Sequence, residues 1–377
     1  MHGGTVLLIL GGLAVLVVGG EVLVRGAAGL ARAMGMSSLV VGLTVVAFAT
    51  SAPELAVTVD AVLAGTPGLA VGNVVGSNIA NVLLVLGLAA LILPLAVRSQ
   101  LVRADIPVMV ALSVVTLLLA LDGGFSRLDG VVLFAALVAY LVVAVTVGRR
   151  RARGEVAART EESDTRTEEV PADGGRDAVR RRSVVDLALV AVGVGLLVVG
   201  ARWLVRGATD VAAAVGVSDL VIGLTVVAVG TSLPEVATSV IAAVRGERDM
   251  AVGNVVGSCL FNLGAVLGLA ALLAPDVVPV ADAAVAFDIP FMVAVALALV
   301  PIAFTGFTVA RWEGALFVAY YVAYVVYVLL DATGHDALEP YSEVMLGFVV
   351  PITVVWLGLL VAYEIGVHRG RQERVLP

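Results

Sequence analysis

The chain has 377 residues, of which 60% are apolar and 14% are charged, and its formal net charge is −7. Its mean hydropathy of +1.08 lies far above the range of soluble globular proteins. This composition excludes a soluble enzyme and a basic nucleic-acid-binding protein, and it predicts an all-α, polytopic membrane protein. The single cysteine, Cys259, can form no disulfide within the chain and has no second thiolate with which to hold a metal.

Eleven apolar segments of membrane-spanning length follow one another along the chain. The first begins directly after Met1–Gly4 with no basic segment or cleavage site, which favours a retained helix over a signal peptide. The predicted spans are 5–30, 38–64, 69–94, 105–122, 128–148, 183–210, 218–244, 250–274, 284–304, 310–330 and 343–366.

The longest polar segment, 149–182, contains ten arginines among many acidic residues. We expect it to be a flexible cytoplasmic linker between a first five-helix repeat, 1–148, and a second, 183–330. Residues 331–377 then add an outer loop, an extra transmembrane helix and a cytoplasmic tail. Arginines gather at the helix ends on the linker side of the cell membrane. Because positively charged loops stay in the cytoplasm, the N-terminus is expected outside the cell and the C-terminus in the cytoplasm. Because each repeat has an odd number of spans, the two repeats are expected to be inverted.

The two repeats share a sequence motif. GLTVVAFATSAPE at 42–54 returns as GLTVVAVGTSLPE at 223–235, and AVGNVVGS at 70–77 returns unchanged at 251–258. About 30 of the 52 positions from Val40 to Leu91 are identical to the residue 181 positions later. Each copy places a glutamate, Glu54 or Glu235, inside an apolar span. Two such units indicate a transporter with its site between the halves.

A polar stripe lies on one face of the second predicted span and is repeated on the seventh. Its members are three, four and seven residues apart, a spacing that places them on one side of a helix. They are Ala47, Thr50, Ser51, Glu54 and Thr58 in the first copy, and Ala228, Thr231, Ser232, Glu235 and Ser239 in the second. Carboxylate, hydroxyl and carbonyl oxygens are the ligands of hard cations such as Na⁺ and Ca²⁺.

A proline directly precedes each glutamate, at Pro53 and Pro234. A proline within a helix removes one backbone donor, so carbonyls near Ala47–Ala49 and Ala228–Gly230 are expected to be partly free to bind a cation. The alternative is a simple kink whose carbonyls are satisfied by Thr or Ser side chains.

The third and eighth spans each contribute a serine and an asparagine four residues apart, Ser77 with Asn81 and Ser258 with Asn262. This i, i+4 pattern fits neutral oxygen ligands on one helix face. The surrounding Gly-xxx-Gly pattern is also typical of close helix packing, which is the alternative interpretation.

A lone carboxylate at the centre of a membrane helix costs roughly 3 kcal/mol on insertion scales. No arginine in the predicted spans is placed to pair with both glutamates, so the compensating charge should be a bound cation, or protons when the site is empty. Asp60 has no acidic counterpart, because Ile241 occupies the equivalent position. We therefore interpret Asp60 as an interfacial carboxylate rather than a ligand, with a cation-attracting vestibule as the alternative.

The paired G-[TS]-S-x-P-E and G-N-x-x-G-S-x-x-x-N segments resemble the α-repeats of sodium/calcium exchangers, in the calcium/cation antiporter superfamily. The resemblance implies two inverted five-helix units around a central cavity, with long first and sixth helices that slide to alternate access. The cation ligands it implies are Glu54, Glu235, Thr50, Ser51, Ser77, Asn81, Thr231, Ser232 and Ser258, with the carbonyls of Ala47 and Ala228. The chain departs from the family at Asn262, where some members carry aspartate, and in its eleventh helix.

The leading functional hypothesis is antiport of Na⁺ against Ca²⁺ at one cage of oxygen ligands, with no cofactor beyond the transported ions. The closest alternative is Ca²⁺/H⁺ exchange by the same two glutamates. Leu55 and Val236 follow the acids where proton-coupled relatives typically have histidine, which disfavours this alternative. A passive cation channel would need a continuous pore with weak multisite binding. A homo-oligomer in the lipid bilayer is left open.

Overall fold

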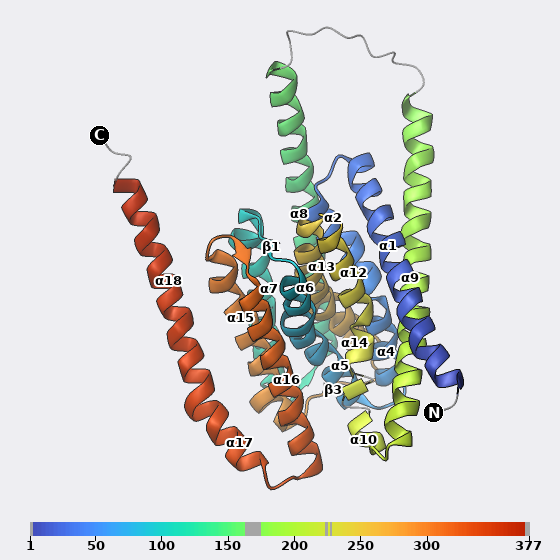
Figure 1. Ribbon diagram of the computed structural model, residues 1–377, viewed down its shortest axis with the longest axis vertical. Helices are drawn as coiled ribbons and strands as arrows, with labels where there is room; N and C mark the ends of the chain where they lie inside the picture. The colour runs from blue at the N-terminus through green and yellow to red at the C-terminus, as the bar shows by residue number, and fades with distance from the viewer. Residues whose placement is uncertain (1–2, 163–174, 223–224, 227, 374–377) are drawn as a thin grey trace.

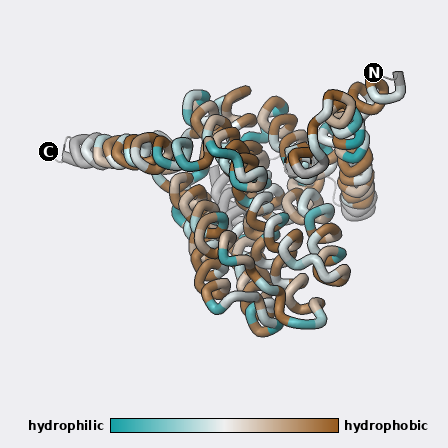
Figure 2. Tube along the Cα trace, turned by 90° about the horizontal axis from the view of Figure 1, so that it is seen from below, coloured by the Kyte–Doolittle hydropathy of each residue, from teal (hydrophilic) through white to brown (hydrophobic). Residues whose placement is uncertain are grey.

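The computed structural model describes residues 3–162, 175–222, 225–226 and 228–373. It is a bundle of helices with two very small sheets (Figure 1), and most residues along the helices are hydrophobic (Figure 2). In this part of the chain, nine helices are long and apolar enough to cross a membrane, and Ser38–Thr50 with Ala52–Leu63 forms one further span bent by 43°. These findings confirm an all-α polytopic membrane protein. The predicted span 218–244 includes residues outside the described ranges, and its C-terminal part is the helix Leu233–Val244.

The first half contains five membrane spans with short π-helical segments inside several of them. Its elements are α1 (Gly3–Met34), α2 (Ser38–Val41), η1 (Gly42–Val46), α3 (Ala47–Thr50), α4 (Ala52–Leu63), α5 (Pro67–Ala80), η2 (Asn81–Leu86), α6 (Gly87–Ile92), β1 (Leu95–Ala96), η3 (Leu101–Asp105), α7 (Ile106–Ala120), β2 (Gly124–Phe125) and α8 (Arg127–Glu162).

The second half repeats this order and then adds a helical hairpin extension. Its elements are α9 (Gly175–Ala214), α10 (Asp219–Ile222), α11 (Ala228–Thr231), α12 (Leu233–Val244), α13 (Arg248–Phe261), η5 (Asn262–Leu267), α14 (Gly268–Leu273), β3 (Val278–Pro279), η6 (Ala284–Asp288), α15 (Ile289–Phe304), β4 (Thr308–Val309), α16 (Arg311–Thr333), α17 (Leu338–Val344), η7 (Met345–Val349) and α18 (Val350–Glu373).

The two small sheets show that the halves are inverted. Strand β1, before α7, pairs with β4, before α16, whereas β2, after α7, pairs with β3, before α15. The single span α7 separates β1 from β2, so the two sheets lie on opposite faces of the bundle. The equivalents β1 and β3 therefore also lie on opposite faces, as inverted repeats require.

The predicted linker, 149–182, is helical at both ends. Helix α8 continues to Glu162 and α9 already begins at Gly175, while residues 163–174 lie outside the described residues. Both helices extend beyond the bundle on the same side of the molecule (Figure 1). The two ends of the expected linker are therefore helical, and its flexibility stays a prediction. Alanine, arginine and glutamate, which are good helix formers, are frequent in 151–162 and allow α8 to continue past its apolar span.

The long helices α1 and α9 pack against each other through glycines spaced by seven residues. Gly12, Gly19 and Gly26 on α1 meet α9, and Gly193, Gly200 and Gly207 on α9 meet α1. A Cβ added at Gly19 would lie 2.8 Å from the backbone nitrogen of Leu197, and one at Gly200 would lie 2.7 Å from that of Leu16. Such distances leave no room for a side chain. The two helices are thus joined backbone to backbone in antiparallel register.

The spans Pro67–Ile92 and Arg248–Leu273 are the most buried of those described. They carry the repeated G-N-x-x-G-S segments, which therefore lie at the centre of the bundle. The C-terminal α18 instead projects away from the bundle (Figure 2). It is held to α16 by a hydrogen bond between Tyr320 and Thr353 and by contact of the Trp312 and Trp356 rings, whose centroids are 4.7 Å apart.

Candidate cation site

The two spans that carry Glu54 and Glu235 are each interrupted at a serine. The next helix begins directly after this serine, with Ala-Pro in the first span and Leu-Pro in the second. Ser51, with φ −82° and ψ 2°, separates α3 from α4, and Ser232, with φ −87° and ψ 2°, separates α11 from α12. Pro53 and Pro234 occupy the first turn of α4 and α12, where their missing N–H group costs no hydrogen bond. Each glutamate thus lies in the first turn of a helix that begins inside the bundle, where the helix dipole favours a negative charge.

The Ala47 carbonyl is less free than the proline position predicted. It accepts the Ser51 amide at 3.0 Å and the Thr50 hydroxyl at 3.4 Å. The Thr back-bonding considered as the alternative is therefore present at this carbonyl. A cation at this position would take the place of the longer hydroxyl contact, since a carbonyl oxygen has two lone pairs.

Glu54 and Glu235, one from each half, lie near each other. Each side chain is only 1% exposed, and the two are close enough for their charges to interact. The ion pairs in the described part of the chain are Arg98–Asp249 and Glu21–Arg245, and neither involves these acids. The described residues therefore place two acids together in the bundle without a basic side chain to neutralise them.

Many buried side-chain oxygens around these acids have no hydrogen-bond partner among the described residues. This is unusual in proteins, where buried polar atoms are almost always paired. Seven of these atoms belong to residues that the sequence predicted as ligands: Ser51 Oγ, Glu54 Oε2, Asn81 Oδ1, Ser232 Oγ, both Glu235 oxygens and Asn262 Oδ1. Asn78 Oδ1 and Thr238 Oγ1, which were not predicted as ligands, also have no partner there. A bound cation would supply the missing partner for such a set of oxygens.

The two halves are joined at the site through Thr50. Its hydroxyl lies 3.2 Å from Asn254 Oδ1 and 3.3 Å from Ser258 Oγ on α13. The π-helical segments η2 and η5 begin at Asn81 and Asn262, one in each half. Such π-segments are frequent at functional sites, because they redirect side chains within a helix.

The structure brings most of the predicted ligands into one buried region. Thr50, Ser51, Glu54, Ser77, Asn81, Ser232, Glu235, Ser258 and Asn262 are all buried, as is Ala47. Thr231, at the end of α11, is half-buried. For Ala228 the structure describes only the backbone, which begins α11. Asp60 is exposed and lies in an outer groove between α4 and α14, apart from the buried region.

Two asparagines support this region, although the prediction did not include them as ligands. Asn73 donates to the Thr58 hydroxyl at 2.8 Å and to the Glu54 carbonyl at 3.3 Å. Asn254, the equivalent in the second half, donates to the Ser239 hydroxyl at 3.0 Å. The sequence contained a pattern that indicates this role. Both asparagines directly follow the first glycine of the repeated segment, and their hydroxyl partners, Thr58 and Ser239, belong to the polar stripe.

We expect Asn254→Ala to weaken Ca²⁺ binding about tenfold. The substitution leaves the buried hydroxyls of Thr50 and Ser239 without this partner, which costs roughly 1–3 kcal/mol. The concentration dependence of ⁴⁵Ca²⁺ uptake into proteoliposomes measures the change. Ser113→Ala is the control, because it removes a buried hydroxyl that bonds only within α7. Equal effects of the two substitutions would contradict a specific role of Asn254.

Inverted five-helix repeats with paired buried acids define the chain as a secondary transporter of cations. A family model described as sodium/calcium exchanger protein matches residues 4–146 and 185–330. The chain belongs to the sodium/calcium exchanger family and is a cation antiporter by that membership. The matched residues end at 330, so α17 and α18 lie outside them.

Individual relatives agree with this family. The sodium/calcium exchanger MaX1 of Methanosarcina acetivorans is 33% identical over 341 residues, covering 85% of this chain and 97% of that protein. The inner membrane protein YrbG of Escherichia coli is 38% identical over 273 residues, covering 72% and 80%. A solved structure of the sodium-calcium exchanger NCX_Mj, soaked with Na⁺ and no Ca²⁺, matches with a TM-score of 0.71 and 33% identity, covering 86% of this chain and 99% of that one.

Proposed function

We propose that this antiporter exchanges Na⁺ for Ca²⁺ at the region between Glu54 and Glu235. The observation that carries the proposal is the pair of buried, neighbouring carboxylates with nearby neutral oxygens that have no partner among the described residues. Two carboxylates balance the charge of one Ca²⁺. Ser51, Ser77, Asn81, Ser232, Ser258 and Asn262 would supply neutral oxygens suited to both Ca²⁺ and Na⁺.

The names of the relatives support this choice of ions. MaX1 is a sodium/calcium exchanger, and the NCX_Mj structures were soaked with Na⁺ and Ca²⁺ or Sr²⁺. In the described part of the chain, no three His, Cys, Asp or Glu side chains form a cluster that could hold a metal. A site of two carboxylates and neutral oxygens suits hard cations and offers little to Zn²⁺ or Cu²⁺.

Alternating access follows from the cost of occluding an empty site. Two bare carboxylates buried together repel each other, so the state closed on both faces is accessible only when cations occupy the site. We place the N-terminus outside and the 149–182 segment and C-terminus in the cytoplasm, because arginines gather on that side. With this orientation, an inward Na⁺ gradient would drive Ca²⁺ out of the cell.

Ion flux in proteoliposomes tests the proposal. Vesicles loaded with Na⁺ and diluted into Na⁺-free buffer should accumulate ⁴⁵Ca²⁺, and vesicles loaded with choline should not. Uptake driven by a pH gradient, with no response to the Na⁺ gradient, would replace this proposal with Ca²⁺/H⁺ exchange. Uptake without any counter-gradient would indicate a channel.

A further inference from the structure

The two faces of the transporter differ in how the long helices cover them. On α12, the face of Ala237 and Ile241 is covered by α1, where a Cβ added at Gly20 would lie 2.5 Å from Ile241 Cδ1. The equivalent face of α4, which includes Ala56 and Asp60, instead lines an open groove. Helix α1 thus closes one side of the bundle, and α9 does not close the corresponding side.

The glycines of the central spans show the same difference. A Cβ added at Gly253 would lie 2.8 Å from the Leu39 carbonyl, and one at Gly257 would lie 2.7 Å from the Leu43 carbonyl, because α2 and η1 pack on α13. Their equivalents, Gly72 and Gly76 on α5, face open space among the described residues. The structure is therefore closed at the face where α12 ends and α13 begins, which we call the closed face.

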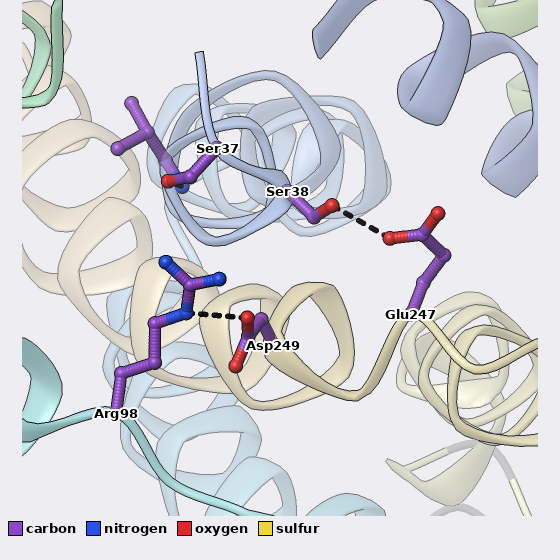
Figure 3. A network of polar contacts seen from close by, with 6 residues as sticks. Ser37, Ser38, Arg98, Glu247 and Asp249 are labelled. Atoms are coloured by element: carbon purple, nitrogen blue, oxygen red, sulfur yellow. Dashed lines mark hydrogen bonds and ion pairs between the residues drawn. The ribbon is translucent and has the colours of Figure 1, made fainter. Parts of the chain in front are cut away.

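Polar contacts join α1 and α2 to the segment between α12 and α13 at the closed face. Arg245, directly after α12, forms an ion pair with Glu21 on α1 at 2.7 Å. Ser38, at the start of α2, donates to Glu247 at 2.6 Å, as Figure 3 shows. Figure 3 also shows the ion pair of Arg98 with Asp249 on α13, at 2.5 Å. It connects the start of α13 to the loop after β1.

The repeat does not duplicate these contacts on the opposite face. In the other repeat, Arg202 is equivalent to Glu21 and Ala64 is equivalent to Arg245. An arginine and an alanine at these positions cannot form an ion pair. The position of Glu247 is occupied by Thr66, whose hydroxyl bonds the Ala61 carbonyl of its own segment. Among the described residues, the equivalent positions on the other face therefore do not repeat the contacts of Glu21, Arg245 and Glu247.

We propose that Glu21 and Arg245, supported by Ser38 and Glu247, form a latch that lowers the free energy of the state closed at this face. Opening the face requires α1 to leave α12, which separates Glu21 from Arg245. The backbone contacts through the glycines make α1 and α9 move as one unit, so the latch acts on the whole moving pair. The two access states are then unequal in population before any ion gradient acts. This inference rests on alternating access but not on the identity of the exchanged ions.

Distance measurements between spin labels test the latch. One label is placed at Arg32→Cys on α1 and the other at Arg103→Cys on η3, two exposed positions, in purified protein reconstituted into lipid nanodiscs. Native Cys259 is buried, and a sample without engineered cysteines checks that it stays unlabelled. The two access states should give two distances, whose populations report the equilibrium directly and require no ion transport.

We expect Glu21→Gln and Arg245→Gln each to raise the ratio of the minor to the major population roughly two- to fivefold, the range for an exposed ion pair. The reversed pair Glu21→Arg with Arg245→Glu should restore the original ratio. Arg248→Gln is the matched control, because this exposed arginine neighbours the latch and forms none of the ion pairs found in the described residues.

Unchanged populations in both single variants would overturn the latch, as would an equal change in Arg248→Gln or no restoration by the reversed pair. The proposed function is judged separately by ion flux. Normal Na⁺-driven Ca²⁺ uptake with unchanged populations rejects the latch alone. Shifted populations without Na⁺-dependent uptake reject the choice of ions and retain the latch.

Discussion

Glu54→Gln and Glu235→Gln should each reduce ⁴⁵Ca²⁺ uptake in Na⁺-loaded proteoliposomes to background. Both side chains are 1% exposed, and the described ion pairs leave both without a basic partner. Removing one negative charge leaves Ca²⁺ with an uncompensated positive charge in a buried region. Breaking a buried charge pair in this way costs roughly 3–5 kcal/mol, which corresponds to a loss of about two to four orders of magnitude in Ca²⁺ affinity.

Asp60→Asn is the control for these variants. Asp60 is an acid only six residues beyond Glu54, but it is exposed in the outer groove of α4. We expect this variant to keep most of the Ca²⁺ flux. Thermal unfolding in detergent should show that the glutamine variants remain folded, since they relieve the repulsion between two buried acids. Near-normal Ca²⁺ flux in either glutamine variant would remove these residues from the site.

Gly19→Leu or Gly200→Leu should separate α1 from α9 and abolish transport. Added side chains at these positions meet backbone atoms of the partner helix at 2.8 and 2.7 Å, where a neighbouring side chain cannot move aside. Overpacking typically costs about 1–3 kcal/mol when side chains can adjust, and backbone contact leaves less room for adjustment. The midpoint of thermal unfolding and Na⁺-dependent ⁴⁵Ca²⁺ uptake measure the two consequences.

Gly195→Leu is the matched control for the glycine variants. Gly195 lies on the same helix, α9, but nothing among the described residues lies within 4 Å of an added Cβ. The substitution is chemically identical, and we expect both stability and uptake to stay near the original values. If Gly195→Leu and Gly200→Leu behaved alike, close packing of α1 on α9 would not explain the loss.

Much of the candidate site could be predicted from the sequence because its signals are local. A carboxylate inside an apolar span stands out by its cost, and the i, i+3, i+4 and i+7 spacing places Thr50, Ser51 and Glu54 on one helix face. The duplication then doubles each signal, so Thr231, Ser232 and Glu235 follow without further assumptions. The ligand roles of these residues remain predictions until the ions are measured.

Other features could not be predicted because they depend on residues that are distant in the chain. The contact of Thr50 with Asn254 joins positions 204 residues apart, and no local pattern encodes it. The Ala47 carbonyl accepts hydrogen bonds from the Thr50 hydroxyl and the Ser51 amide. These bonds depend on the backbone conformation at Ser51, which the position of Pro53 alone does not predict. The expected linker was partly helical because helix propensity in 151–162 outweighed the absence of an apolar face.

The class of protein, the inverted duplication and the paired acids could be predicted directly, since hydropathy and repetition can be read along the chain. Which face is closed, and how α1 and α9 fit together, appeared only in the folded molecule. Two repeats of the same fold can close either face, and the choice depends on contacts between them. Glu21 and Arg245 are 224 residues apart, and their pairing becomes visible only when α1 lies on α12.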